Sequence, residues 1–296
     1  MLCLESAGGR NFPPPYAFHR LMPESATTAR LLALRPSTLL PPPEESLLGV
    51  GLALTDYERT LDWIDEMVAV RERGYVCVAA VHTVMACADD PELAGAVRAS
   101  SFTVPDGQPL VWALNALGHR LPDRVYGPDL MWKACARAAR TGTRMYLHGG
   151  RNEPEALAGL TRKLRLAHPG LRIVGGSTQH FGEYSEEELD RVAAEINAKR
   201  PDVVWVGLGV PRQEKWMQRM RPRLEAPVLV GVGAAFDFHA GLVPQAPDWM
   251  QRFGLEWLFR LGHEPRRLWR RYLRYNPRFV TGFARQYARH LRTRGR

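Results

Sequence analysis

Short apolar runs alternate with amphipathic segments along the central part of the chain. Four such runs, closed by glycines, are residues 145–150, 171–176, 203–209 and 227–233. Apolar residues at helical spacing predict helices after the first two runs, near 153–167 and 185–199. This alternation predicts an α/β fold, with a mostly parallel, Rossmann-like sheet and helices on both faces. Ligands of such sheets bind at the carboxyl ends of the strands, where the glycines fall.

The segment that precedes this alternation carries the same two kinds of pattern. Apolar residues at helical spacing predict a helix over Thr55–Arg73, with Thr55 as its N-cap. A β-rich run at 75–81 predicts a strand, and a further helix is expected over Asp90–Ala99. A Pro-Asp-Gly turn at 105–107 then leads into another helix.

The pattern divides the chain into three regions. Residues 1–46 contain Pro-Pro-Pro twice and show no apolar periodicity, which predicts a disordered or loosely attached arm. Residues 47–250 are expected to form the α/β domain. Residues 251–296 are expected to form a basic helical appendage.

Charge is distributed unevenly along the chain. The formal net charge is +9. The segment from Gln251 to Arg296 holds thirteen arginines but only two acidic residues, Glu256 and Glu264. The basic excess therefore lies entirely in the predicted appendage, and the preceding 250 residues are slightly acidic.

The appendage combines this charge with apolar and aromatic residues at helical spacing. Its arginines at one helical face are Arg267, Arg270, Arg271, Arg274 and Arg278. An apolar stripe resumes beyond Pro277, which predicts two consecutive basic amphipathic helices. Such helices are typical of an anchor at an anionic membrane surface. Nucleic-acid binding is the alternative, because a basic patch with aromatic residues is also its signature, although no known nucleic-acid-binding module accompanies it.

Several function classes lack their sequence signals. No apolar run approaches the roughly 20 residues of a membrane-spanning helix, and a secretory signal is missing. The four cysteines form no CxxC pair, so a reducing cytoplasm is expected. Arg212 occupies the place of the third glycine of a dinucleotide fingerprint, and no Walker loop occurs. No DxD motif is present, so neither a metal nor a cofactor is expected.

The remaining chemistry favours a phosphorylated ligand. A strand that ends in glycine and turns into a helix presents free N–H groups and a positive dipole end to a phosphate. Asp106 is a candidate general base on a rigid turn, although Asp-Gly is common in turns for local reasons. Arg124 is a candidate diphosphate ligand, and Asp129 a candidate N-cap. Gln213 could read a base or a sugar hydroxyl, whereas the adjacent Glu214 is expected only to complement a helix dipole.

Six motifs occur in an order that resembles a known family. They are PDG at 105, RVYGPDL at 124, GLGVPRQE at 207, GVGAAFDFHAG at 231, APDW at 246 and GLEWLFRLGHEPRRLWRRY at 254. Together they resemble the WecG/TagA/CpsF family of bacterial glycosyltransferases over about residues 49–275. The resemblance implies transfer of a sugar from a UDP-sugar to an undecaprenyl-diphosphate-linked saccharide, with inversion and without a metal, at the cytoplasmic face of the plasma membrane. Such reactions build wall polymers, capsules or exopolysaccharides.

The resemblance also implies roles for individual residues. It makes Asp106 the catalytic base and places Arg124 and Gln213 in the donor and active-site pocket. The arginines of an appendage that closes over the pocket are Arg260, Arg267 and Arg270. Further substrate-binding residues are expected in the glycine-rich motifs, namely Gly207, Gly209, Gly233 and Asp237.

This chain departs from the family pattern at two places. Val78 and Ala80 replace the Thr and Asn of a Thr-x-Asn strand, so His82 and Thr83 are expected to supply polar contacts there. Gln245 stands where a basic residue usually precedes Ala-Pro. The donor sugar, the acceptor saccharide and the oligomeric state are left open by the sequence. A nucleotide-sugar-modifying enzyme with soluble substrates is a third alternative, and removal of the appendage would then leave the activity unaffected.

Overall fold

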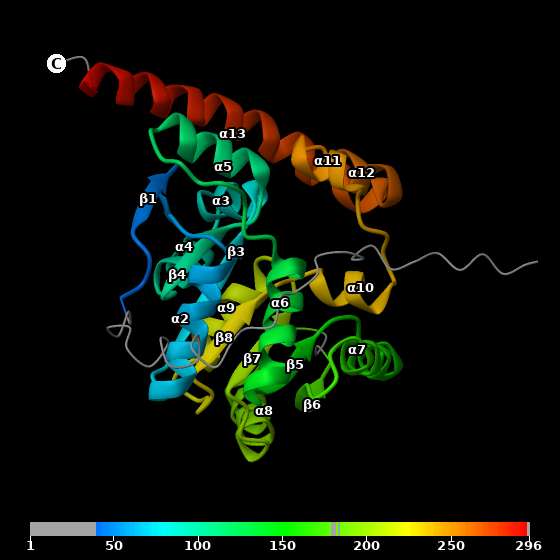
Figure 1. Ribbon diagram of the computed structural model, residues 1–296. Coiled ribbons are helices and arrows are strands. Elements are labelled where there is room, and N and C mark those ends of the chain that lie inside the picture. Colours follow the sequence, from blue (N-terminus) through cyan, green and yellow to red (C-terminus); the bar gives the residue numbers. More distant parts are fainter. Residues whose placement is uncertain (1–39, 179–181, 183, 295–296) are drawn as a thin grey trace, which may run out of the picture. The chain divides into compact units, whose positions relative to one another are not determined.

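A parallel six-stranded sheet forms the centre of the α/β domain (Figure 1). The computed structural model describes residues 40–178, 182 and 184–294, all within one unit that begins at Leu39. The strand order is β4-β3-β8-β7-β5-β6, and every neighbouring pair is parallel. The strands are β3 (Gly74–Ala79), β4 (Phe102–Pro105), β5 (Arg144–Gly149), β6 (Arg172–Ser177), β7 (Val203–Gly207) and β8 (Val228–Gly231). The predicted α/β fold and parallel sheet are confirmed.

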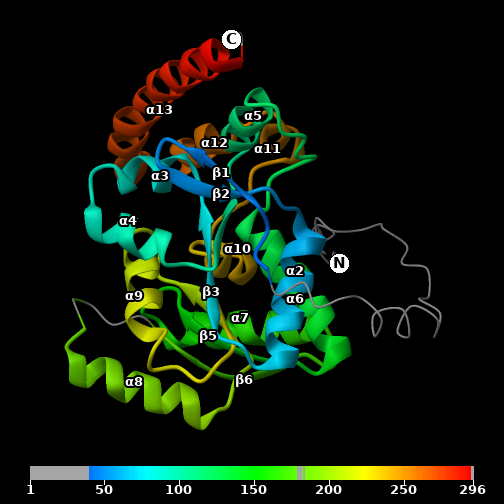
Figure 2. The same cartoon turned by 90° about the vertical axis from the view of Figure 1, so that its left-hand side faces the viewer.

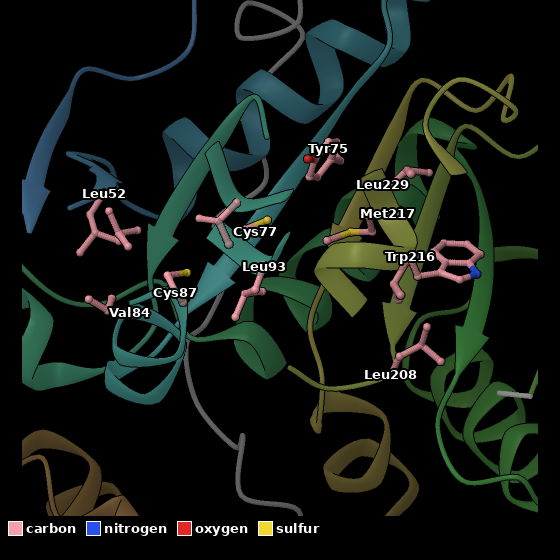
Figure 3. Close-up of a cluster of buried hydrophobic side chains, with 14 of the residues drawn as sticks. Leu52, Tyr75, Cys77, Val84, Cys87, Leu93, Leu208, Trp216, Met217 and Leu229 are labelled. Carbon is pink, nitrogen blue, oxygen red and sulfur yellow. The ribbon is translucent and has the colours of Figure 1, made fainter. Parts of the chain in front are cut away.

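Helices cover both faces of this sheet. Successive side chains of a strand point to opposite faces, and because these strands are mostly apolar, both faces need a covering layer. One face packs against α3 (Val81–Cys87), α4 (Pro91–Arg98), α5 (Gln108–Ala116), α8 (Glu186–Ala198) and α9 (Arg212–Met220). The other face packs against α2 (Tyr57–Val70), α6 (Gly127–Thr141), α7 (Pro154–Ala167) and α10 (Ala235–Ala240). Tyr146 of β5 lies in the first cluster, whereas its neighbours Met145 and Leu147 lie in the second. Figure 3 shows the first cluster, in which Cys77 and Leu229 of the sheet face helical residues such as Leu93 and Met217.

A short antiparallel hairpin precedes the sheet. It consists of β1 (Glu44–Leu47) and β2 (Val50–Ala53). Leu47 and Leu52 of this hairpin are fully buried in the first cluster. The hairpin falls at the boundary of the predicted N-terminal arm, of which residues 1–39 lie outside the described part of the chain.

The appendage contains three helices that follow the α/β domain. They are α11 (Asp248–Arg252), α12 (Glu256–His263) and α13 (Pro265–Arg294). α13 lies along α3, and in Figure 2 it is the red helix at the top of the view, above α3. Leu268 and Phe279 of α13 are buried, and the amide of Gln286 exchanges hydrogen bonds with Ser46 O (2.7 Å) and Leu48 N (2.9 Å). One face of α13 therefore packs on the domain while its other residues remain exposed.

Three local predictions are wrong. Asp56, not Thr55, is the N-cap of α2 and accepts a hydrogen bond from Arg59 N, since the Thr55 hydroxyl turns inward towards Thr60. Asp129 is not the N-cap of α6, because Pro128 occupies the first turn and the helix begins at Gly127. α13 continues through Pro277, where two helices were expected. Packing of the apolar face on both sides of this proline offsets the missing N–H.

Candidate active site

The glycine-rich ends of β5, β7 and β8 and the turn after β4 surround one cavity of about 410 Å³. The sheet register explains this convergence, because Gly149 pairs with Gly207 and Val206 with Gly231 at the same edge. The residues of this cavity come from three groups: strand ends, helix starts and the appendage. They include Val78, Ala80, His82, Asp106, Tyr126, Arg151, Gly207, Gly209, Arg212, Gln213, Gly233, Asp237, Phe238, Glu256, Arg260, Glu264 and Arg271.

Asp106 lies in the wall of this cavity, immediately after β4. Its Oδ1 accepts a hydrogen bond of 2.8 Å from the backbone N–H of Gly127, the first residue of α6. The pKa of Asp106 is raised to about 6, mainly by burial and to a smaller degree by Glu256, although Arg124, the Gly127 N–H and Arg260 act in the opposite direction. At neutral pH the carboxylate is ionised but unusually basic. These are the properties that a general base requires.

Arg124 is buried behind the cavity and is not among its lining residues. Its guanidinium donates to Glu256 Oε2 (2.7 Å) and to Gln251 Oε1 (2.8 Å). It also stacks over the Tyr126 ring, 4.1 Å from the centroid. The Tyr126 hydroxyl donates to Glu256 Oε1 over 2.9 Å. Arg124, a predicted diphosphate ligand, thus bonds two residues of the appendage.

Gln213 borders the cavity, but both ends of its amide bond other residues of the protein. Its Oε1 accepts from Gly233 N (2.9 Å), and its Nε2 donates to Glu214 Oε1 (2.8 Å). It therefore fixes the loop after β8 to the start of α9. Glu214 is fully buried, and burial raises its pKa to about 7. The sequence predicted only a dipole contact for Glu214, because its spacing does not reveal that it points into the core.

The strand that lacks the family's Thr-x-Asn contributes apolar Val78 and Ala80 to the cavity. His82 lines it too, and burial together with Arg271 and Arg260 lowers the pKa of His82 to about 3, so the imidazole is neutral. Thr83 is fully buried and accepts a hydrogen bond from Ala80 N (3.3 Å). Of the two expected substitutes, only His82 faces the cavity.

Four arginines of the described chain line the cavity. Arg151 and Arg212 follow the ends of β5 and β7, while Arg260 and Arg271 come from the appendage. Arg151 forms a loose ion pair of 3.4 Å with Asp237, and Arg260 lies over the Phe238 ring. Together with the glycine loops, this arrangement suits the charge of a diphosphate.

Of the other two predicted arginines, Arg270 has a described side chain, and it lies outside the cavity. Arg270 is exposed and its guanidinium lies over the Trp269 ring, outside the set of cavity residues. The backbone of Arg267 belongs to α13, and its side chain is outside the described part. Gln245 lies just before Ala246, whose carbonyl accepts from Gln251 Nε2 (2.8 Å).

The cavity residues that sequence reasoning missed include Tyr126, Arg151, Arg212, Glu256 and Arg271. Tyr126, Arg212, Glu256 and Arg271 belong to the motifs that resemble the family. No spacing rule connects Glu256 to Arg124, however, because 132 positions separate them.

The appendage exposes large apolar side chains next to its arginines. They are Trp249, Phe253, Trp257, Leu258, Trp269, Leu273, Val280 and Leu291. None of the helices within residues 40–178 and 184–294 combines the length and apolarity that crossing a bilayer requires. Several large exposed apolar residues in one segment favour a role in binding another surface.

Comparisons of the sequence with known proteins find a matching family and named relatives. The model of the Glycosyl transferase WecG/TagA/CpsF family matches residues 45–293. Two relatives bear the name N-acetylglucosaminyldiphosphoundecaprenol N-acetyl-beta-D-mannosaminyltransferase. The relative from Bacillus subtilis is 32% identical over 177 residues, which cover 60% of this chain and 66% of that protein. The relative from Bacillus spizizenii is 32% identical over 192 residues, 65% of this chain and 71% of that protein.

Proposed function

Because the chain belongs to the WecG/TagA/CpsF family of glycosyl transferases, we propose that it transfers a sugar from a UDP-sugar to a polyprenyl-diphosphate-linked saccharide. The names of the relatives support N-acetylmannosamine as the donated sugar and N-acetylglucosamine diphosphoundecaprenol as the acceptor. The product would serve cell-surface polysaccharide synthesis.

The observation that carries this proposal is the position of Asp106. A partly buried carboxylate with a pKa of about 6 faces a cavity that is also lined by glycine loops and arginines. One cavity thus combines a candidate base with groups that suit a leaving diphosphate. An acceptor hydroxyl between them could attack the anomeric carbon while UDP departs.

In this mechanism Asp106 takes the proton of the acceptor hydroxyl as the new glycosidic bond forms. The bond between the anomeric carbon and the UDP oxygen breaks in the same displacement, which inverts the configuration. Arg151, Arg212, Arg260 and the amides of the glycine loops stabilise the charge that develops on UDP. Guanidinium groups and helix N-termini thus take the role that a metal has in other transferases.

We further propose that the exposed apolar residues and arginines of the appendage bind the surface of an anionic membrane. The acceptor is a membrane lipid, so binding there would bring the cavity to its substrate. Arginine stems cover apolar surface while their heads contact lipid phosphates. In a competition test, the protein should prefer anionic vesicles to duplex DNA, and preference for DNA would contradict this part of the proposal.

The direct test measures UDP release from a panel of UDP-sugars in the presence of N-acetylglucosamine diphosphate linked to a short polyprenyl chain. We expect release from UDP-N-acetylmannosamine that depends on the acceptor, continues in EDTA and yields a β-linked disaccharide. Release that is independent of the acceptor would contradict the proposed transfer. An α-linked product would contradict single displacement.

A further inference from the structure

We propose that Glu256 is a positioning residue, which clasps α12 of the appendage against Arg124 and Tyr126 and shields Asp106 from the charge of Arg124. The inference rests on the proposed function, and it assigns a role to a residue outside the predicted catalytic set. Glu256 and its two partners are far apart in sequence, since Arg124 and Tyr126 precede α6 and Glu256 is the first residue of α12.

The contacts of Glu256 occupy both oxygens of its carboxylate. Oε2 accepts from Arg124 Nη1 over 2.7 Å, and Oε1 accepts from the Tyr126 hydroxyl over 2.9 Å. A further hydrogen bond of 2.8 Å joins Arg124 Nη2 to Gln251 Oε1 on α11. The Gln251 amide also donates to Ala246 O, so the segment leading into the appendage is fixed to the same guanidinium.

The burial of this ion pair makes it costly to break. The side chains of Arg124 and Glu256 are only 9% and 13% exposed. Removal of one partner from a buried pair leaves an uncompensated charge, whereas exposed pairs contribute little. The Arg124–Glu256 ion pair is therefore a stronger link between appendage and domain than the exposed ion pairs of Arg274 and Arg278 with Asp89.

Arg124 does not line the cavity, so a ligand in the cavity would not contact its guanidinium directly. Glu256 and Tyr126 line the cavity, whereas Arg124 lies behind them. Arg124 therefore acts on the cavity only through its field and its contacts. A free guanidinium beside Asp106 would favour the ionised carboxylate and weaken it as a base. The negative charge of Glu256, paired with Arg124, opposes part of this effect.

Charged and titratable groups surround Asp106 from every neighbouring element. Arg124 and Tyr126 precede α6. Tyr57 belongs to α2, and its pKa is raised mainly by burial, then by Asp129 and to a smaller degree by Asp106. His82 of α3 and Arg271 of α13 share the cavity, and α12 contributes Glu256 and Arg260. Arg124 and Arg260 lower the pKa of Asp106, whereas Glu256 raises it. Loss of Glu256 alone would leave the two cations unopposed.

The test uses the full-length chain and the dependence of kcat/KM on pH, measured with UDP-N-acetylmannosamine and the short acceptor. In the wild type, kcat/KM should fall below a pH of about 6, as Asp106 becomes protonated. In Glu256→Gln this acid limb should move to lower pH, on the order of one unit, because a negative charge that raises the pKa of Asp106 is removed. The plateau should fall about tenfold, since a weaker base and a looser α12 both act.

Two further variants show whether the effect passes through Arg124. In the double variant Glu256→Gln/Arg124→Met both charges are absent, so the acid limb should return at least to its wild-type position. Glu92→Gln removes an exposed carboxylate on α4 that pairs with Lys215, and it should leave the limb unchanged. Two results would overturn the shielding role. One is an acid limb of kcat/KM at the wild-type pH in Glu256→Gln, and the other is an acid limb that stays at the lower pH in the double variant.

Hydrogen exchange gives a readout that does not depend on activity. Amides of α12 should exchange at least threefold faster in Glu256→Gln than in the wild type, while those of β7 stay equally protected. Equal protection of α12 would overturn the clasp. If the wild type transfers no sugar from any donor, the proposed function fails. Hydrogen exchange of the α12 amides then still tests whether Glu256 holds α12 against Arg124 and Tyr126. If the wild type is active but Glu256→Gln keeps its limb, only the inference fails.

Discussion

The backbone N–H of Gly127 points at the carboxylate of Asp106 and donates a hydrogen bond of 2.8 Å to its Oδ1. Gly127 begins α6, so the positive end of that helix also faces the carboxylate. This contact fixes the side chain through one oxygen. Oδ2 accepts no hydrogen bond from another described residue, and Asp106 is among the residues that line the cavity.

Substitution Asp106→Asn should lower kcat by about 10²- to 10⁴-fold, because an amide cannot take the proton of the acceptor. The amide oxygen can still accept from Gly127, so the fold should be kept. Initial rates of UDP release and a melting curve check both expectations. Asp56→Asn is the matched control, because asparagine also caps a helix and Asp56 lies at the start of α2. Equal loss of rate in both variants would argue against a base at position 106.

Substitution Glu214→Gln should stabilise the protein at high pH. The folded-state pKa of Glu214 is about 7 and its ordinary value is 4.5, so the folded state binds the proton more tightly. Wild-type stability is therefore lost as pH rises from 4.5 through 7, whereas glutamine does not ionise. The gain should be small at pH 5 and reach at most about 3 kcal/mol at pH 8.5. Urea unfolding at the two pH values measures it.

The control for this experiment is Glu225→Gln, which removes an exposed carboxylate before β8. Its effect on the free energy of unfolding should be within about 0.5 kcal/mol at both pH values. A gain for Glu214→Gln that is the same at pH 5 and pH 8.5 would show that ionisation is not its cause.

Substitution Arg212→Gln should weaken the binding of UDP about tenfold, since it removes one charge-assisted hydrogen bond. Arg212 is the first residue of α9 and borders the cavity beside Gly209. Calorimetric titration with UDP gives the Kd. Arg191→Gln on the exposed side of α8 should leave the Kd unchanged. An unaltered Kd in Arg212→Gln would place the diphosphate elsewhere.

Substitution Leu273→Gln should weaken binding to anionic vesicles about five- to twentyfold, because it removes exposed apolar area from the surface of α13 that is proposed to bind the membrane. Leu273 is 68% exposed, so the fold should tolerate the change. Leu166→Gln on α7 alters an equally exposed leucine, at 75%, outside the appendage. Flotation with the two variants should separate them, and equal binding would exclude Leu273 from the membrane contact.

Much of the candidate site could be predicted because glycines and Asp106 share a simple rule. Each follows a predicted parallel strand, and the carboxyl ends of such strands meet at one edge. The structure places Gly207, Gly209, Gly233 and Asp106 around the same cavity. The surroundings of Arg124 and Gln213 could not be predicted in this way. Their partners depend on where the appendage docks and on how α9 packs, and neither leaves a periodic signal.

The sequence by itself determined the order of strands and helices, the basic appendage and the residues able to carry acid–base chemistry, because these depend on local periodicity and side-chain type. Tertiary structure decided which charges meet. It turned Glu214 into a buried acid, joined Arg124 to Glu256 and kept α13 helical through Pro277. Contacts between residues more than a hundred positions apart arise only when the elements pack, and packing fixes both their distances and their desolvation.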